Sequence, residues 1–222
     1  IFDYVMGWFR LSKVVGAWVE WLVNARLKEW YGCIEANSYQ QGWFVPHDVP
    51  GMVNLMGGKE KVIADLTDFF NKTPSNMLWN EYYNHANEPE HFVPFLFNQL
   101  EVPLYTQKWT RYTCEKAYAN KVEGIVGNED VGQMSAWYEL AASGIHPSCP
   151  GNTRMEITSP VFDKVEFNLD PSYYTGKKFT VIAHNNSINN VYIQKALLNG
   201  QEYNKCYLDF ADIAAGGTLE LF

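Results

Sequence analysis

Three short acidic segments recur along this 222-residue sequence, and each precedes a stretch whose pattern predicts a helix: Cys33–Asn37, His85–Pro89 and Gly127–Asp130. The intervals match one helix out, a turn and one helix back, so the carboxylates are expected to gather on one rim. A pair of carboxyl groups beside an aromatic-lined pocket is the arrangement that hydrolyses glycosidic bonds, because one protonates the leaving oxygen and the other activates water. The candidates are Glu35, Glu88, Glu129 and Asp130.

Each of these acidic residues also has a structural alternative. Asp and Glu are favoured near helix N-termini, where they cap backbone N–H groups and face the positive end of the dipole. Asn87 and Glu88 stand directly before Pro89, which is suited to the first turn of a helix, so they fit a capping pair. An amide oxygen beside a carboxylate also suits a hard cation such as calcium. The residues alone leave both interpretations open.

Histidine and cysteine point less clearly to chemistry. The five histidines show no metal-binding spacing, and for His85 and His91 substrate hydrogen bonding or packing at a helix end is favoured over a transition-metal site. Cys33 lies near Glu35 but has no evident base, so a thiol nucleophile is not expected. Several aromatic residues could line a sugar cleft, although packing in the core is favoured for any one of them. They are Trp43, Phe44, Trp79, Tyr82, Tyr83, Trp137 and Tyr138.

Composition excludes some classes of function. The formal net charge of −8 and the lack of a Lys/Arg cluster argue against a nucleic-acid partner. No apolar run approaches the ~18 residues of a membrane span, so none is expected. The four cysteines contain no CxxC pair, so neither a zinc site nor a dense disulfide framework is predicted. The start, Ile1–Tyr4, has neither a Met nor a signal pattern, so we expect a longer protein.

Hydrophobic periodicity predicts helices through most of the first 150 residues. Residues 1–34 are mixed, because Gly7, Gly16 and Gly32 interrupt a near-helical pattern. Antiparallel helical hairpins with alternating short and long connections would place the acidic loops at one end. The predicted helices cover 46–56, 59–70, 89–100, 103–119 and 131–143.

After Pro150 the pattern changes to short β-rich runs, at 165–169, 178–184, 191–197 and 218–221. Asn199-Gly200 is a strong signal for a two-residue hairpin. The fold class is therefore mainly α with a β-rich C-terminal region of antiparallel strands. We divide the chain into residues 1–150, a helical domain, and residues 151–222, the β-rich region.

Four strings resemble glycoside hydrolase family 92, which contains calcium-dependent, inverting exo-α-mannosidases, many of them specific for α-1,2 linkages. They are Trp43–Val49, Leu55–Gly58, His85–His91 and Gly127–Tyr138, and the resemblance extends from Phe2 to the closing Leu198–Gly200 and Ala215–Leu219. It implies the C-terminal part of a catalytic (α/α)6 toroid followed by sheet strands. An N-terminal β-sandwich and the first toroid helices would then be missing partners of this chain.

The resemblance also implies roles for individual residues. Glu35 would be the general acid, Asp130 the base, and Asn87 and Glu88 would hold Ca²⁺. A mannose-containing glycan would be the substrate, in an extracytoplasmic setting. An inverting pair of carboxyl groups should lie ~6.5–9.5 Å apart. The substrate would be bound by His85, Asn128, Glu129, Trp43 and Asp48.

Two departures from the family pattern bear on these roles. Some members have a second Asp two residues before the base, where this chain has Asn128, and residues 10–18 differ from the family's Arg-x-Arg and Asp-Gly-x-Trp patterns. One alternative is a noncatalytic fragment or carbohydrate-binding subunit that needs the missing N-terminal half or a partner chain. A sugar phosphorylase would need a basic phosphate site, which the sequence does not show.

Overall fold

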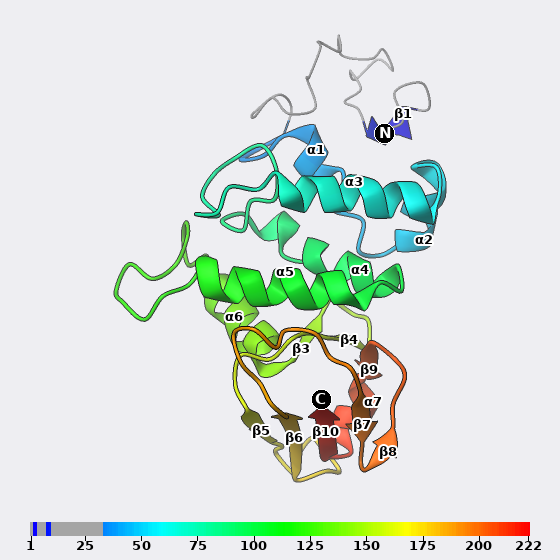
Figure 1. Ribbon diagram of the computed structural model, residues 1–222, viewed down its shortest axis with the longest axis vertical. Coiled ribbons are helices and arrows are strands. Elements are labelled where there is room, and N and C mark those ends of the chain that lie inside the picture. The colour runs from blue at the N-terminus through cyan, green and yellow to red at the C-terminus, as the bar shows by residue number, and fades with distance from the viewer. Residues whose placement is uncertain (1, 4–7, 10–32) are drawn as a thin grey trace. The chain divides into compact units, whose positions relative to one another are not determined.

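The computed structural model describes residues 2–3, 8–9 and 33–222 (Figure 1). It divides into two compact units: the first contains residues 1–93 and 119–128, and the second 94–118 and 129–222. Most of the segment predicted as mixed, including the divergent residues 10–18, lies outside the described residues. Its described part is a short antiparallel pair of strands, β1 (Phe2–Asp3) and β2 (Trp8–Phe9).

The first unit is built on α1 (Ser38–Gln41), α2 (Val49–Leu55) and α3 (Lys59–Asn71). The predicted hairpin of α2 and α3 is confirmed, and the two helices contact each other. The turn between them depends on Gly57 and Gly58, whose φ values of 97° and 104° suit glycine. Helix α3 buries the apolar face expected from a 3.6-residue period, at Val62, Leu66, Phe69 and Phe70.

The prediction of one continuous helix over residues 89–100 is wrong. The structure has two single 3₁₀ turns, η2 (Glu88–Glu90) and η3 (Val93–Phe95), and then the one-turn helix α4 (Leu96–Gln99). Pro94 lacks a backbone N–H, and its ring clashes with the preceding turn of an α-helix, which accounts for the break. The chain before Pro94 is thereby free to form a loop rather than a helix.

In the second unit α5 (Pro103–Lys116) packs on α4 and on α6 (Gln133–Ser143). Both longer helices were predicted, and each is two or three residues shorter than the pattern suggested. Helix α6 ends at Gly144 with φ 99°, the left-handed C-terminal glycine that the sequence indicated. A buried cluster holds this part together: Phe95, Cys114, Trp137, Ala141 and Ala142.

The β-rich region forms two sheets. The smaller has the order β3 (Ile145–Pro147), β4 (Arg154–Ile157) and β9 (Tyr207–Asp209). The larger has the order β5 (Lys164–Asn168), β6 (Lys178–Ala183), β10 (Gly217–Leu221), β7 (Ala196–Leu198) and β8 (Gln201–Glu202). A short helix, α7 (Phe210–Ala214), follows β9.

Most of these pairs are antiparallel as predicted, but β10 runs parallel to β6, with Leu219 opposite Val181. The long intervening segment supplies the crossover that a parallel pair requires. The predicted hairpin at Asn199-Gly200 is confirmed: it joins β7 to β8, and both residues have left-handed φ values, 53° and 79°. Strand β7 begins at Ala196, later than the predicted residue 191.

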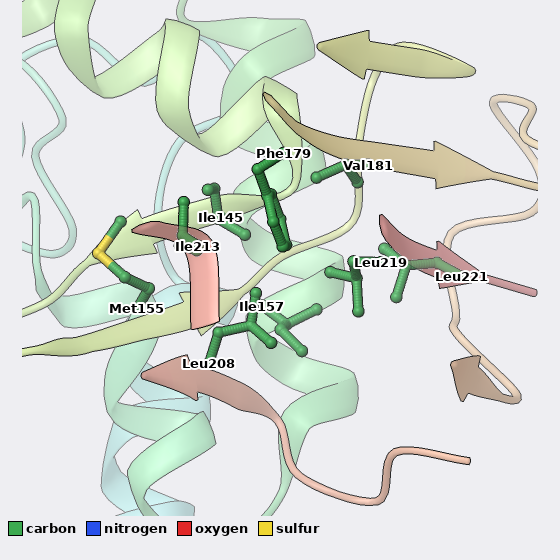
Figure 2. Packing of buried hydrophobic residues seen from close by; sticks show 9 residues of the cluster. All are labelled: Ile145, Met155, Ile157, Phe179, Val181, Leu208, Ile213, Leu219 and Leu221. Atoms are coloured by element: carbon green, nitrogen blue, oxygen red, sulfur yellow. The ribbon is translucent and has the colours of Figure 1, made fainter. Parts of the chain in front are cut away.

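Apolar residues from both sheets and from α7 form one core (Figure 2). Phe179, Leu219 and Leu208 are fully buried within it. Helices α5 and α6 belong to the same compact unit as these strands, while the division into domains at residue 150 stays a prediction. No helix in the described part of the chain has the length and apolar character that crossing a membrane requires.

Asn98, on α4, ties this helix to the strand region. Its buried amide donates hydrogen bonds to the carbonyls of Ile157 and Cys206, both at 3.0 Å. We expect Asn98→Ala to lower the free energy of unfolding by about 1–3 kcal/mol, because two buried carbonyls lose their donor. Urea denaturation would measure the loss. The exposed Asn168→Ala is the control, and an equal effect of both changes would contradict this role for Asn98.

Candidate active site

The first acidic loop is held in place by the amides at the start of α1. The Asn37 side chain accepts from Gln40 N at 2.9 Å, and the Gln40 side chain accepts from Asn37 N at 2.9 Å, which is a reciprocal capping box. The same side chains reach the segment of residues 80–82. Asn37 donates to the carbonyl of Glu81, and Gln40 donates to those of Asn80 and Tyr82. The loop that carries Glu35 is thus fixed from its C-terminal side.

The second acidic loop contacts the first directly. Asn87 donates its Nδ2–H to the backbone carbonyl of Glu35 at 3.1 Å, across 52 positions of sequence. Asn87 occupies the N-cap position of η2 but makes no side-chain capping bond. The helix-capping alternative for this amide is therefore not what the structure shows. Its side chain instead joins the predicted acid loop to the predicted metal loop.

Part of the third acidic loop also belongs to the first unit. Gly127 has φ 80°, and a Cβ built on it would lie 2.7 Å from the Cβ of Ala86. Only glycine allows this close approach together with this backbone conformation. Asn128 follows and is exposed. The predicted gathering of the acidic loops is thus seen for the first two loops and for the start of the third.

Glu35 and Asp130 share an unusual backbone conformation. Their φ values are 55° and 50°, and Val131 continues the left-handed run at 58°. Such values cost energy for residues other than glycine, and most of all for a β-branched side chain such as valine. Backbone strain of this kind concentrates at functional sites, where the surrounding structure enforces it. The two residues predicted to carry the chemistry are among the few that show it.

The carboxylates differ in what their side chains do. Those of Glu35 and Asp130 are exposed and make no hydrogen bond or ion pair within the described residues. In contrast, Glu129 accepts from Ser135 N at 3.1 Å and from Ser135 Oγ at 3.0 Å at the start of α6. Asp48 caps α2 by accepting from Gly51 N at 2.9 Å. Capping accounts for Glu129 and Asp48, and their substrate-binding roles stay predictions.

His85 is fully buried, and neighbouring rings fix its orientation. Its Nδ1 lies 2.7 Å from the Tyr83 hydroxyl, and its ring centroid lies 4.7 Å from that of His91. His91 Nε2 is 2.9 Å from the His85 carbonyl, which only accepts, so this nitrogen must carry a proton. These contacts fit packing near a helix end, and the substrate-binding role of His85 stays a prediction.

Three of the seven candidate aromatic residues, Trp43, Tyr83 and Trp137, are fully buried in the core. Trp43 is fully buried between Tyr39 and Phe69, with ring centroids 6.0 and 5.9 Å away. Its role in substrate binding stays a prediction. Phe44 and Trp79 are about half exposed, and so remain available to line a cleft.

Sequence reasoning did not single out Glu90, although it is part of the same loop. It is buried, and its Oε2 accepts from Asn84 N at 2.8 Å. Burial raises the pKa of this carboxyl well above its usual range, and the Asn84 hydrogen bond lowers it only in part. Glu90 therefore fixes the entry of the loop that presents Asn87 and Glu88. No local pattern indicated its burial, because Glu90 follows Glu88-Pro89, a pair typical of an exposed helix start.

Comparison with known proteins shows the family of this chain. The family model of the glycosyl hydrolase family 92 catalytic domain matches residues 1–222. The chain belongs to family 92. The helices followed by a β-rich region with antiparallel pairs agree with the solved structures of this family.

Two solved structures illustrate the likeness. The family 92 α-mannosidase BT3965 from Bacteroides thetaiotaomicron is 31% identical, with a TM-score of 0.88, and the match covers 99% of this chain but 28% of that one. The inverting mannosidase BT2199 from the same organism is 33% identical, with a TM-score of 0.85 and coverage of 99% and 31%.

A fungal relative is similar in sequence. The protein named Uncharacterized secreted glycosidase, from Arthroderma benhamiae, is 32% identical over 189 residues. These residues are 84% of this chain and 23% of that protein. This chain therefore spans less than a third of the length of each of these three relatives.

The Gly127 contact yields a first prediction for this site. Gly127→Ala should destabilise the protein by about 1–3 kcal/mol, because the new Cβ meets Ala86. Gly132→Ala is the matched control: φ is 92°, but nothing lies within 4 Å of the added Cβ. That change should cost only about 1 kcal/mol of backbone strain. Urea denaturation of both variants measures the difference, and equal losses would show that the Ala86 contact does not fix the loop.

Glu90 yields a prediction for pH dependence. Because folding raises the pKa of this carboxyl, the folded state holds the proton more tightly than the unfolded chain. Its contribution to stability is therefore present at acid pH and is lost as pH rises through the folded pKa. Glu90→Gln keeps an acceptor for Asn84 N and removes the titration, so its stability should fall less over that range. Unfolding across pH with a calcium chelator tests this, and identical profiles would contradict it.

Proposed function

We propose that the complete protein is a calcium-dependent, inverting exo-α-mannosidase that releases terminal, α-1,2-linked mannose from glycans. The observation that carries this proposal is the Asn87–Glu35 hydrogen bond, which joins the predicted acid loop to the predicted calcium loop. Glu35 has a left-handed backbone, and its carboxyl makes no hydrogen bond or ion pair among residues 33–222. The mannosidases among the solved relatives support the substrate class, and one of them was solved in complex with mannoimidazole.

In this mechanism the two unengaged carboxyl groups act on opposite sides of the scissile bond. Glu35, protonated, donates its proton to the glycosidic oxygen as the bond to the anomeric carbon breaks. Ionised Asp130 takes a proton from a water molecule, and the water oxygen bonds to the anomeric carbon from the other face, which inverts its configuration. Both residues return to their starting states after exchange with solvent.

Asn87 and Glu88 fit a calcium ion in their chemistry. Asn87 uses its Nδ2 on Glu35, and its Oδ1 receives no hydrogen bond within the described residues. The half-buried carboxylate of Glu88 is its neighbour, and oxygen donors of this kind are what calcium prefers. Among residues 33–222 no three His, Cys, Asp or Glu side chains gather as a metal site, so water and sugar hydroxyls would complete the set. Bound calcium would supply a fixed charge that holds vicinal hydroxyls.

The remainder of the fold is also part of the proposal. Because the chain spans 28–31% of the solved relatives, we propose that an N-terminal β-sandwich and further helices complete an (α/α)6 toroid with it. The same coverage also supports the alternative function, in which this chain is a noncatalytic fragment that needs the N-terminal portion for activity. The secreted relative supports an extracytoplasmic setting.

The test is release of mannose from α-1,2-mannobiose, by this chain and by the chain joined to the remaining portion. We expect activity that a calcium chelator removes, and that falls by at least about 100-fold in Glu35→Gln and in Asp130→Asn, since each removes a general acid or base. Glu60→Gln is the matched control. Glu60 is an exposed carboxylate in the first turn of α3 and has no predicted role in the site, so its loss should affect activity far less.

Each outcome decides between the candidates. Activity that survives both the Glu35 and the Asp130 change would contradict the assigned roles. Activity found only in the joined protein would identify this chain as part of a shared site. Phosphate as the acceptor in place of water tests the phosphorylase alternative.

A further inference from the structure

The second unit contains a pocket that the proposed mechanism does not use. It has a volume of about 310 Å³ and lies where β6 ends, between the loop of residues 184–194 and the end of β10. No Asp or Glu is among its lining residues within the described chain, although the whole chain carries a formal charge of −8. The lining combines two basic side chains with amides and aromatic rings: Arg111, His184, Asn186, Asn189, Tyr192 and Phe222.

Arg111 is the distinctive residue of this pocket. It is only 5% exposed, yet it forms no ion pair within the described residues. Its Nη2 donates to the carbonyl of Pro160 and to Asn186 Oδ1, both neutral acceptors. Of the five N–H donors of the guanidinium, the buried one on Nε has no acceptor in the described part of the chain. Burial lowers the pKa of Arg111, and the carboxylate of Glu115, one turn further along α5, opposes this shift only in part.

The surrounding loop is already ordered by its own contacts. Asn186 accepts from Arg111 and donates to the carbonyl of Val161 at 3.0 Å, while Asn190 donates to that of Asn185 at 2.8 Å. His184 pairs with Glu220 at 2.9 Å and stacks on Phe222 with centroids 4.1 Å apart. These bonds hold the pocket wall without supplying an anion to Arg111.

We propose that this pocket binds a small oxyanion carried on a polyhydroxylated skeleton, such as a sugar acid or a sugar phosphate, with Arg111 holding the oxyanion. The planar fork of a guanidinium matches two oxygens of a carboxylate or phosphate. Amide side chains both donate and accept, as sugar hydroxyls do. The volume suits a ligand of monosaccharide size, because it lies at the lower end of small-molecule pockets. This site is independent of the proposed mannosidase mechanism.

Isothermal titration calorimetry of the full chain tests the proposal with four probes: glucuronate, glucose 6-phosphate, neutral glucose and inorganic phosphate. We expect at least one anionic sugar to bind about tenfold or more tightly than glucose, since a charge-assisted pair adds that much. Tighter binding of glucuronate would identify carboxylate as the preferred group, and tighter binding of glucose 6-phosphate would identify phosphate. Anionic sugars that bind no better than glucose would overturn the proposal. Inorganic phosphate that binds as tightly as the sugar phosphate would overturn the role of the hydroxyls.

Two variants locate the site. Arg111→Lys keeps the charge but loses the fork, and should weaken the anionic sugar about tenfold. Because this change could disturb packing, Asn189→Asp is the second variant. Asn189 is exposed, its side chain makes no hydrogen bond within the described residues, and a negative charge there should weaken binding several-fold. The matched Asn168→Asp, on β5 outside the pocket, should leave binding unchanged. Equal affinities of the Asn189 and Asn168 variants would place the anion elsewhere.

Discussion

The hydrogen bond from Asn87 Nδ2 to the backbone carbonyl of Glu35 is the contact on which the candidate site depends. It fixes the Glu35 loop from one side, while the capping box of Asn37 and Gln40 fixes it from the other. Each of these amides also donates its side-chain N–H to a backbone carbonyl of another segment. These bonds hold the backbone of the loop at both ends and do not involve the carboxyl of Glu35. The loop can therefore present this carboxyl in one position, which is the preorganisation that a reacting group needs.

The same constraint explains why strain is tolerated here. A left-handed glutamate or aspartate would relax if its neighbours allowed it, so the conformation persists only where the surrounding bonds determine it. Around Asp130 the following helix supplies that support: Glu129 caps α6 through Ser135, and the Asp130 carbonyl accepts from Gln133 N at 3.2 Å. Within the part of the chain that the structure describes, the acidic side chains thus divide into those that stabilise helix ends, such as Glu129, and those that make no such contact, Glu35 and Asp130.

Long, strongly periodic elements were predictable from the sequence. The apolar face of α3, the glycine that ends α6 and the Asn199-Gly200 turn all follow from local rules that the structure obeys. The break at Pro94 could have been found, because proline interrupts a helix wherever it falls beyond the first turn. The three-stranded sheet could not, since its strands have only three or four residues and their pairing joins distant segments.

Buried charged groups were the other limit of sequence analysis. Nothing in the sequence around Glu90 or Arg111 distinguishes them from solvated residues, and only tertiary contacts reveal their burial. The recurring acidic loops pointed to Glu35 and Asn87, and the family resemblance supplied their roles, but no local pattern relates the two residues that the bond between their loops joins. The toroid and the calcium ion remain proposals that rest on the family.

The assignment of Glu35 and Asp130 is tested most directly by the separation of their carboxyl groups in a crystal structure of the complete protein with calcium and a mannose-like inhibitor. An inverting pair leaves room for a water molecule, so we predict a separation of about 6.5–9.5 Å. A separation near 5 Å would contradict inversion, because that distance is typical of retaining enzymes. Carboxyl groups on different sides of the protein, with the inhibitor beside neither, would contradict the assignment of this pair.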